Sequence, residues 1–306
     1  MIAVLGKGGV GRTCVSGALA LLAAQSGLRT LVMETDPQTP LAAGFGKSPT
    51  FSPLRLADNL WGMLLGGQES LEDYLGKVVP RAVLRMVFAS SLYQYFVQAA
   101  PALRELTMMG KIYNEIERPS ANEPPWDLIV FDAPASGQAI SMLRMPFVAR
   151  KSFGGSLVGR EATEVADFFR NRALCAMAVV TTAEPLAMAE TLDLNRQLAK
   201  LQLETNAMFF NRASTAGFES ADISRMLRRW KRKPELPRAR HLAEIARAEL
   251  KRKNREDRAL EILRRQIGAP MIVLRECANL AGTNLLGNLC EQLASTTDRS
   301  AAALKA

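Results

Sequence analysis

The 306-residue chain has few of the side chains that most often hold metals or form covalent cross-links. It contains one histidine, and its four cysteines, Cys14, Cys175, Cys277 and Cys290, are scattered without a CxxC pair. Structural zinc sites and disulfide frameworks need paired or closely spaced ligands, so neither is expected. Because unpaired, scattered cysteines are typical of a reducing compartment, we expect a cytoplasmic protein, and leave peripheral association with a membrane open.

Long hydrophobic runs are also lacking. No window of about 18 uncharged apolar residues occurs, so no membrane-spanning segment is predicted. The first apolar run, Met1–Leu5, has no basic leader and is not predicted to be a signal peptide. The hydrophobic content of 48%, with 21 glycines and 15 prolines, is ordinary for a globular protein and excludes collagen-like or low-complexity chains.

The positive charge is concentrated in one segment. The net charge is +9, but Arg225–Arg265 alone holds 16 Lys or Arg against 6 Asp or Glu, so the remainder carries −1. One interpretation is a solvated helix whose acids pair with bases at i,i+4 spacing. The other is a surface for nucleic acid or an anionic membrane, centred on the dense cluster Arg228–Lys233.

Short, uniformly apolar runs alternate with helix-like stretches along the chain. Such runs, without in/out alternation, are typical of strands covered on both faces, and their alternation with helices predicts a mostly parallel sheet of the α/β class. The predicted strands are Ile2–Leu5, Thr30–Glu34, Leu128–Asp132, Ala176–Thr182, Ala207–Asn211 and Met271–Leu274.

No convincing strand is found between residues 49 and 125. Apolar spacing there predicts helices over Glu69–Gly76, Arg81–Gln98 and Ala102–Arg118. We therefore divide the chain into a core, residues 1–48 plus 126–306, and a helical insertion, residues 49–125. The insertion is a candidate for binding a client or partner.

The strongest functional signal is the glycine-rich stretch Gly6–Thr13, which follows a strand and begins a helix, Cys14–Gln25. Glycines there let backbone N–H groups turn inward around a phosphate, at the positive end of the helix dipole. Thr13 stands where a hydroxyl would coordinate Mg²⁺. The pattern GxxxxGK[ST] fails at one position, because Arg12 replaces the lysine. The alternative is a glycine-rich turn without a ligand.

Two acidic residues support the phosphate-binding interpretation. Asp36 follows the second predicted strand, and Asp132 ends the third. Ligand chemistry in open α/β sheets gathers at the carboxyl ends of the strands, and an acidic residue in the position of Asp132 commonly holds Mg²⁺ through a water.

With Lys7 inside the loop, the sequence resembles the deviant phosphate-loop ATPases, which include the MinD and ParA proteins. From residue 1 to about residue 295 it resembles more narrowly the arsenical-pump and tail-anchored-protein-targeting ATPase family, especially its bacterial members. The stretches that carry this narrower resemblance are Thr35–Pro37, Leu103–Ile112, Phe131–Gln138, Val180–Pro185 and Phe209–Arg212.

The resemblance implies a Mg-ATP-dependent homodimer with nucleotide between its subunits. Lys7 would reach the partner's phosphates, Asp36 would orient the attacking water in a switch that includes Pro37, and Asn211, Glu184 and Pro185 would lie near the base. Phosphate contacts would come from Gly6, Lys7, Gly8, Gly9, Val10, Gly11, Arg12, Thr13 and Cys14. The second switch would comprise Asp132, Ala133, Pro134, Ser136 and Gly137, with Thr13 and Asp132 at the magnesium ion.

The main hypothesis is an ATPase that hydrolyses ATP to ADP and phosphate and moves its helical insertion. Departures from the family pattern leave alternatives to it. A planar guanidinium at Arg12 can bind phosphate yet misplace it, which favours a poorly hydrolysing regulatory partner of a paralogue. A third hypothesis is a nucleic-acid-binding, partition-type ATPase. Without a CxxC pair, a zinc-bridged dimer is not supported.

Within the insertion, apolar side chains suggest a groove for a hydrophobic client or membrane partner. The same stripe could equally pack among the insertion's own helices. These residues are Met86, Phe88, Leu92, Tyr95, Phe96, Val97, Leu106, Met108 and Met109.

Overall fold

An eight-stranded sheet forms the centre of the protein in a computed structural model, which describes residues 1–38, 41–78, 101–117, 125–214, 220–231, 237–277 and 279–303. The strand order is β3-β4-β2-β5-β1-β6-β7-β8, and every neighbouring pair is parallel except β3 with β4. The strands are β1 (Ile2–Gly6), β2 (Thr30–Glu34), β3 (Leu54–Ala57), β4 (Leu60–Leu64), β5 (Leu128–Asp132), β6 (Ala176–Thr181), β7 (Thr205–Ala213) and β8 (Met271–Arg275).

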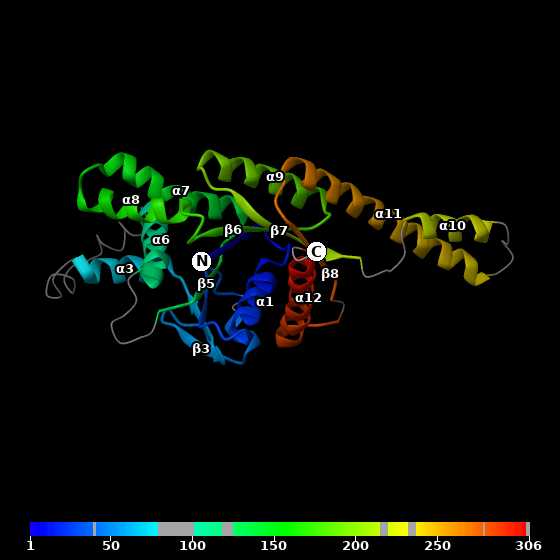
Figure 1. Ribbon diagram of the computed structural model, residues 1–306, viewed down its shortest axis with the longest axis horizontal. Coiled ribbons are helices and arrows are strands. Elements are labelled where there is room, and N and C mark those ends of the chain that lie inside the picture. The colour runs from blue at the N-terminus through cyan, green and yellow to red at the C-terminus, as the bar shows by residue number, and fades with distance from the viewer. Residues whose placement is uncertain are drawn as a thin grey trace.

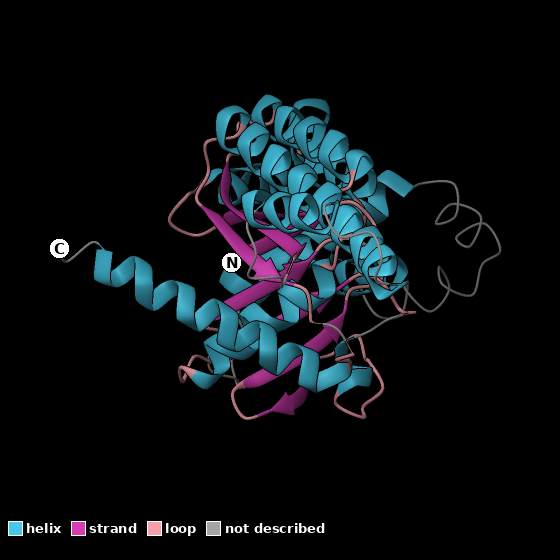
Figure 2. Ribbon diagram, turned by 90° about the vertical axis from the view of Figure 1, so that its right-hand side faces the viewer, coloured by secondary structure: helices cyan, strands magenta, loops and turns pink. Residues whose placement is uncertain are grey.

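Helices cover both faces of this sheet (Figure 1). One face packs on α1 and α12, and the other on α6, α7, α8, α9 and α11. Figure 2 shows the sheet between these layers, with the long C-terminal helix crossing one face. The helices are α1 (Arg12–Gln25), α2 (Leu41–Gly44), α3 (Gly67–Val78), α6 (Pro101–Glu117), α7 (Ser136–Phe153), α8 (Leu157–Arg170), α9 (Pro185–Lys200), α10 (Ser220–Lys231), α11 (Pro237–Gln266) and α12 (Gly282–Ala303).

Two cores explain why the central strands are apolar throughout. Leu31 and Met33 of β2 face the layer that contains α6 to α9, whereas Val32 faces α1 and α12. Every residue of β2 is buried. The predicted α/β fold is therefore confirmed, and the six predicted strands are all present within one or two residues of their expected bounds.

The prediction that residues 49–125 lack strands is wrong. β3 and β4 form a hairpin there, and β4 pairs in parallel with β2, with Thr30 opposite Leu60. The turn between them places Asn59 at a left-handed φ of 54°, which Asn tolerates better than most residues. The segment therefore extends the sheet before it contributes the helices α3 and α6.

Part of the predicted insertion lies outside the described residues. This applies to the helix expected over Arg81–Gln98 and to six of its groove residues, Met86, Phe88, Leu92, Tyr95, Phe96 and Val97. Of the remaining three, Met108 and Met109 are buried in the core beside the sheet, whereas Leu106 lines a cavity. For these two methionines the packing alternative is correct.

The basic segment forms a helical hairpin. α10 packs along α11, and the two helices extend beyond the sheet, away from α3 and α8 (Figure 1). The C-terminal part of α11 returns to the body, where Ala259 and Leu263 join the core. Among the helices that the structure describes, none is long and apolar enough to cross a bilayer.

Candidate functional site

The glycine-rich loop between β1 and α1 has the geometry of an anion-binding turn. Gly9 and Gly11 have φ angles of 84° and 94°, in the left-handed region that favours glycine. A side chain added at Gly8 or Gly9 would meet nothing within 4 Å, so the loop faces open space. The first turn of α1 contains no acidic residue, and its N-cap has no side-chain hydrogen bond. The helix N-terminus is therefore available to a negatively charged ligand.

Two other glycines allow close packing beneath the loop. A Cβ at Gly6 would overlap the carbonyl oxygen of Val180 on β6, and a Cβ at Gly11 would overlap the side-chain amide of Asn211 on β7. Asn211 is 6% exposed, and its Nδ2 donates to the carbonyl oxygen of Val10 at 2.9 Å. Its Oδ1 accepts from the backbone N–H of Arg212. Asn211, expected near the base, thus supports the loop from below.

Asp132 lies where β5 ends, directly below the start of α1. Its two carboxylate oxygens accept hydrogen bonds from the hydroxyls of Thr13, at 2.7 Å, and Ser16, at 2.9 Å. Burial raises the pKa of Asp132, although both hydroxyls and the Arg12 guanidinium favour its charged form. Sequence reasoning missed Ser16. Its i,i+3 spacing from Thr13 places both hydroxyls on one face of α1 and could have identified it.

Arg12 joins the glycine-rich loop to the segment after β5. Its Nη1 donates to the carbonyl oxygen of Ala133 at 2.5 Å. Burial lowers the pKa of Arg12, whereas the negative charges of Asp132 and Asp36 raise it by a smaller amount. In this conformation the guanidinium is turned towards the β5 loop, and its position there depends on a backbone carbonyl.

A second buried carboxyl lies beside Asp132 and was also missed. Glu34 ends β2, is 2% exposed, and is the register partner of Asp132 across the β2–β5 pair. Its Oε1 accepts from the backbone N–H of Leu41 at 2.6 Å. Burial raises the pKa of Glu34 to about 7, and the charges of Asp132 and Asp36 add to this effect. An acidic residue at the end of an otherwise apolar strand was the available signal.

The remaining predicted residues lie around this centre at the surface. Asp36 is exposed, and its Oδ1 accepts from the N–H of Gln38 at 2.8 Å. Lys7 extends from the loop, with its Nζ 3.4 Å from the carbonyl oxygen of Gly8. Cys14, in the first turn of α1, is partly buried, which raises its thiol pKa.

The predicted second switch, from Ala133 to Gly137, connects β5 to α7. Ser136 donates to Glu190 of α9 at 2.8 Å, while Gly137 is exposed. Glu184 and Pro185 form the N-cap and first turn of α9. Among the described residues, no hydrogen bond or ion pair joins either of them to the glycine-rich loop. Their expected position near the base stays a prediction.

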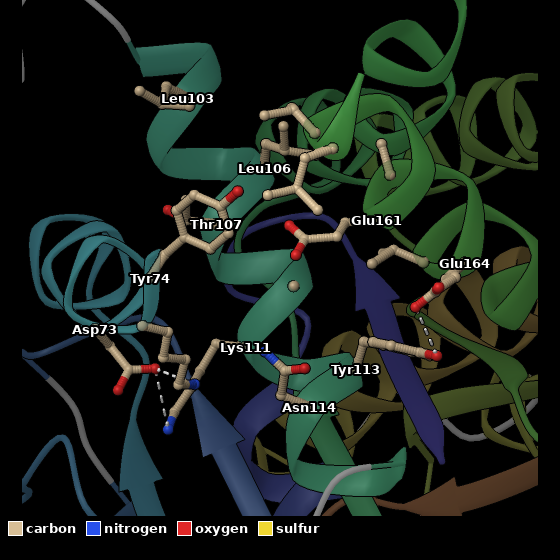
Figure 3. Close-up of a pocket in the computed structure, with 16 residues that line it drawn as sticks. Asp73, Tyr74, Leu103, Leu106, Thr107, Lys111, Tyr113, Asn114, Glu161 and Glu164 are labelled. Atoms are coloured by element: carbon tan, nitrogen blue, oxygen red, sulfur yellow. Dashed lines mark hydrogen bonds and ion pairs between the residues drawn. The ribbon is translucent and has the colours of Figure 1, made fainter. Parts of the chain in front are cut away.

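A separate cavity of about 510 Å³ lies between α3, α6 and α8 (Figure 3). Tyr74, Thr107 and Glu161 point towards one another inside it, and Leu106 contributes an apolar wall. Burial and a hydrogen bond with Glu161 raise the pKa of Tyr74 to about 12. The cavity therefore combines an apolar wall with a protonated phenol at neutral pH.

Comparison with known proteins places these features in context. The family described as anion-transporting ATPase matches residues 1–162. ATPase BagA of Mycobacterium tuberculosis is 26% identical over 234 residues, which cover 72% of this chain and 67% of that protein. An ATPase ASNA1 homolog of Paramecium tetraurelia is 29% identical over 152 residues, or 49% and 45% of the two chains. A putative arsenical pump-driving ATPase of Halobacterium salinarum is 28% identical over 152 residues, or 46% and 23%.

Proposed function

This chain belongs to the anion-transporting ATPase family, as an ATPase of the arsenical-pump and targeting type, and we propose that it works as a dimeric switch that hydrolyses ATP to ADP and phosphate. The observation that carries the proposal is the contact of Thr13 and Asp132 beneath an open glycine-rich loop. An anion nest and a pair of oxygen ligands lie there side by side.

The residues present fit a magnesium nucleotide. The open loop and the uncapped N-terminus of α1 supply donors to phosphate oxygens. The Thr13 hydroxyl and the Asp132 carboxylate are hard oxygen ligands of the kind that Mg²⁺ prefers, the latter through water. When bound, Mg²⁺ neutralises charge on the β- and γ-phosphates.

The exposed residues around this centre have complementary roles in the proposal. Asp36 accepts a proton or orients water from the first switch loop, and Lys7 reaches the phosphates bound by a second protomer. Arg12 links the loop to Ala133, so that a γ-phosphate competing for its guanidinium would release the second switch. Positioning and charge neutralisation account for most of such catalysis.

The first experiment measures steady-state Mg-ATP hydrolysis by the wild type and by Asp36→Asn. Asparagine preserves the Oδ1 that accepts from Gln38, so the loop should keep its shape while the charge is lost. We expect the rate to fall at least about tenfold. The matched control is Asp58→Asn, which changes an exposed carboxylate in the β3–β4 turn. Equal rates in the three proteins would refute the assignment of Asp36.

Mixing two inactive variants tests whether Lys7 acts across a dimer. If it does, Lys7→Ala and Asp36→Asn subunits complement each other, because one site of each heterodimer keeps both groups. Random mixing should then restore about a quarter of the wild-type rate. Absence of any recovery would place Lys7 in the site of its own chain. Small-angle scattering with and without ATP, on the unmixed wild type, reports whether the dimer changes shape.

A second candidate function is nucleotide binding with little hydrolysis, in partnership with a paralogue. The observation that favours it is the hydrogen bond from Arg12 to the Ala133 carbonyl, which engages the guanidinium with the segment after β5. A lysine ammonium is a compact charge without the planar guanidinium, and it matches the lysine of the GxxxxGK[ST] pattern. Arg12→Lys should therefore raise the hydrolysis rate if the arginine limits turnover, whereas an unchanged or lower rate removes this candidate.

The cavity between α3, α6 and α8 supports a role in handling a hydrophobic client, with a membrane partner as the alternative. Its wall includes Leu106, and it lies on the same face of the sheet as the second switch and α7. Binding of the fluorescent apolar probe ANS should respond to ATP and fall in Leu106→Ser. Val148→Ser on the exposed surface of α7 is the control. If ANS binding changes neither on addition of ATP nor in Leu106→Ser, this part of the proposal is contradicted.

A further inference from the structure

A groove of about 440 Å³ lies between α9 and α11, on the side of the molecule where the basic hairpin meets the body (Figure 1). Its walls come from segments more than 50 residues apart in the chain. α9 supplies Pro185, Met188 and Leu192, whereas α11 supplies three cations and Ile262. The groove shares no lining residue with the glycine-rich loop, and it has Pro185 in common with the residues predicted near the base.

The cations are Lys251, Arg255 and Arg258, which follow one another at i,i+4 and i+7 on one face of α11. All three are exposed, and among the described residues none forms an ion pair. No acidic side chain lines the groove. Three cations therefore share one concave surface without a counter-charge.

The acids in the part of α11 that lines the groove, from Glu249 to Glu261, have other partners. Glu256 is buried and binds Arg252, Asp257 binds Lys253, and Glu261 binds Arg265. Glu249 accepts from the hydroxyl of Ser214. The i,i+4 pairing expected for a solvated basic helix is therefore present on the other faces of α11. The face of α11 that lines the groove therefore carries only positive charge.

The floor of the groove is apolar. Met188 is 8% exposed at its base, and Ile262, 40% exposed, forms part of its rim. Pro185 begins α9, a 16-residue helix whose N-cap is the acidic Glu184, so the positive field of the groove comes from the three cations of α11. An apolar floor beneath a cationic rim is complementary to a molecule with a hydrocarbon part and a negative head.

We propose that this groove binds a single-chain anionic amphiphile, with its hydrocarbon chain on the α9 side and its carboxylate or phosphate head against Lys251, Arg255 and Arg258. The volume lies within the roughly 300–1,000 Å³ typical of small-molecule sites. A neutral lipid would leave the three cations without a partner. Nucleic acid would leave the apolar floor unused, and no aromatic side chain lines the groove to stack with a base. The proposal does not depend on ATP hydrolysis.

The test measures binding of dodecanoate, below its micelle concentration, by calorimetry with the full-length protein. The variant combines Lys251→Gln, Arg255→Gln and Arg258→Gln. The matched control combines Arg228→Gln, Arg229→Gln and Arg264→Gln, which removes the same charge from exposed positions of the same hairpin outside the groove. Dodecanol and butyrate test the head and the chain separately, and vesicles of phosphatidylcholine with 30% phosphatidylserine test a membrane surface.

We expect saturable binding of one dodecanoate per chain, weakened about tenfold in the groove variant and unchanged in the control. Dodecanol and butyrate should each bind more weakly than dodecanoate. Equal weakening in both triple variants would overturn the proposal, since it would show a general effect of charge. Binding to vesicles or to duplex DNA without binding of monomeric dodecanoate would overturn it in favour of a membrane or nucleic-acid surface.

Discussion

Replacing Glu34 by glutamine should change how the stability of the protein depends on pH. Glu34 is 2% exposed and lies beside Asp132 at the carboxyl edge of the sheet. Its pKa is raised from the ordinary value of 4.5 to about 7, first because burial disfavours the charged form. Glutamine has nearly the same shape and keeps an oxygen that can accept from the N–H of Leu41. The substitution therefore removes the titration with little change in packing.

The magnitude follows from linkage between protonation and folding. Between pH 4.5 and 7 the folded protein holds a proton on Glu34 that the unfolded chain has released. The stability that protonated Glu34 contributes is therefore fully present below its pKa in the unfolded chain. It is lost as the pH rises through its pKa in the folded protein. For these two pKa values the free energy of unfolding falls by about 2–3 kcal/mol between pH 5 and pH 8.

Urea denaturation of the wild type and of Glu34→Gln at several pH values measures this difference. Asp132 is present in both proteins, so the difference between the two curves reports Glu34 together with its coupling to Asp132. Glu117→Gln, at an exposed carboxyl on α6, is the control and should follow the wild type. Parallel curves for the wild type and Glu34→Gln from pH 5 to pH 8 would refute the reasoning, because Glu34 would then titrate alike in the folded and unfolded states.

Two further substitutions test the packing of the loop and of Asp132. Gly11→Ala should lower stability by about 2–3 kcal/mol, because it adds a Cβ at φ 94° against Asn211. Gly8→Ala adds a Cβ that meets nothing within 4 Å, so its stability should match that of the wild type, and thermal melting compares the two. Ser16→Ala removes one donor to the buried carboxyl of Asp132 and should cost about 1–3 kcal/mol. An equal loss in Ser26→Ala, at the other end of α1, would show that Asp132 is not the cause.

Local sequence patterns were sufficient to predict most of the fold. Thr30–Glu34 and Leu128–Asp132 are strands at the predicted bounds, because a short, uniformly apolar run must be covered on both faces wherever it lies. The glycine spacing after β1 likewise predicted the loop, since positive φ angles at Gly9 and Gly11 are a local requirement. The family assignment also rests on the sequence itself.

The β3–β4 hairpin shows where local patterns were insufficient. β3 is four residues long and contains Arg55, and β4 is an uncharged run of five with Gly62 at its centre. β3 pairs with β4 and β4 pairs with β2, and the second of these contacts is not local in the chain. The dipeptide Asp58-Asn59 was a turn signal that could have revealed it. Sequence periodicity describes how an element presents its faces, but not which neighbour satisfies its backbone.

The amino-acid sequence by itself determined the α/β class, the central strands, the glycine-rich loop and the acids at the strand ends, because each depends on residues close together in the chain. Only the tertiary structure decided that Glu34 lies buried beside Asp132, that Arg12 binds the carbonyl of Ala133, and that α9 and α11 enclose a cationic groove. These contacts join residues from about 60 to more than 120 positions apart. Strand order and helix packing create them, and with them the electrostatic environment that sets each group's chemistry.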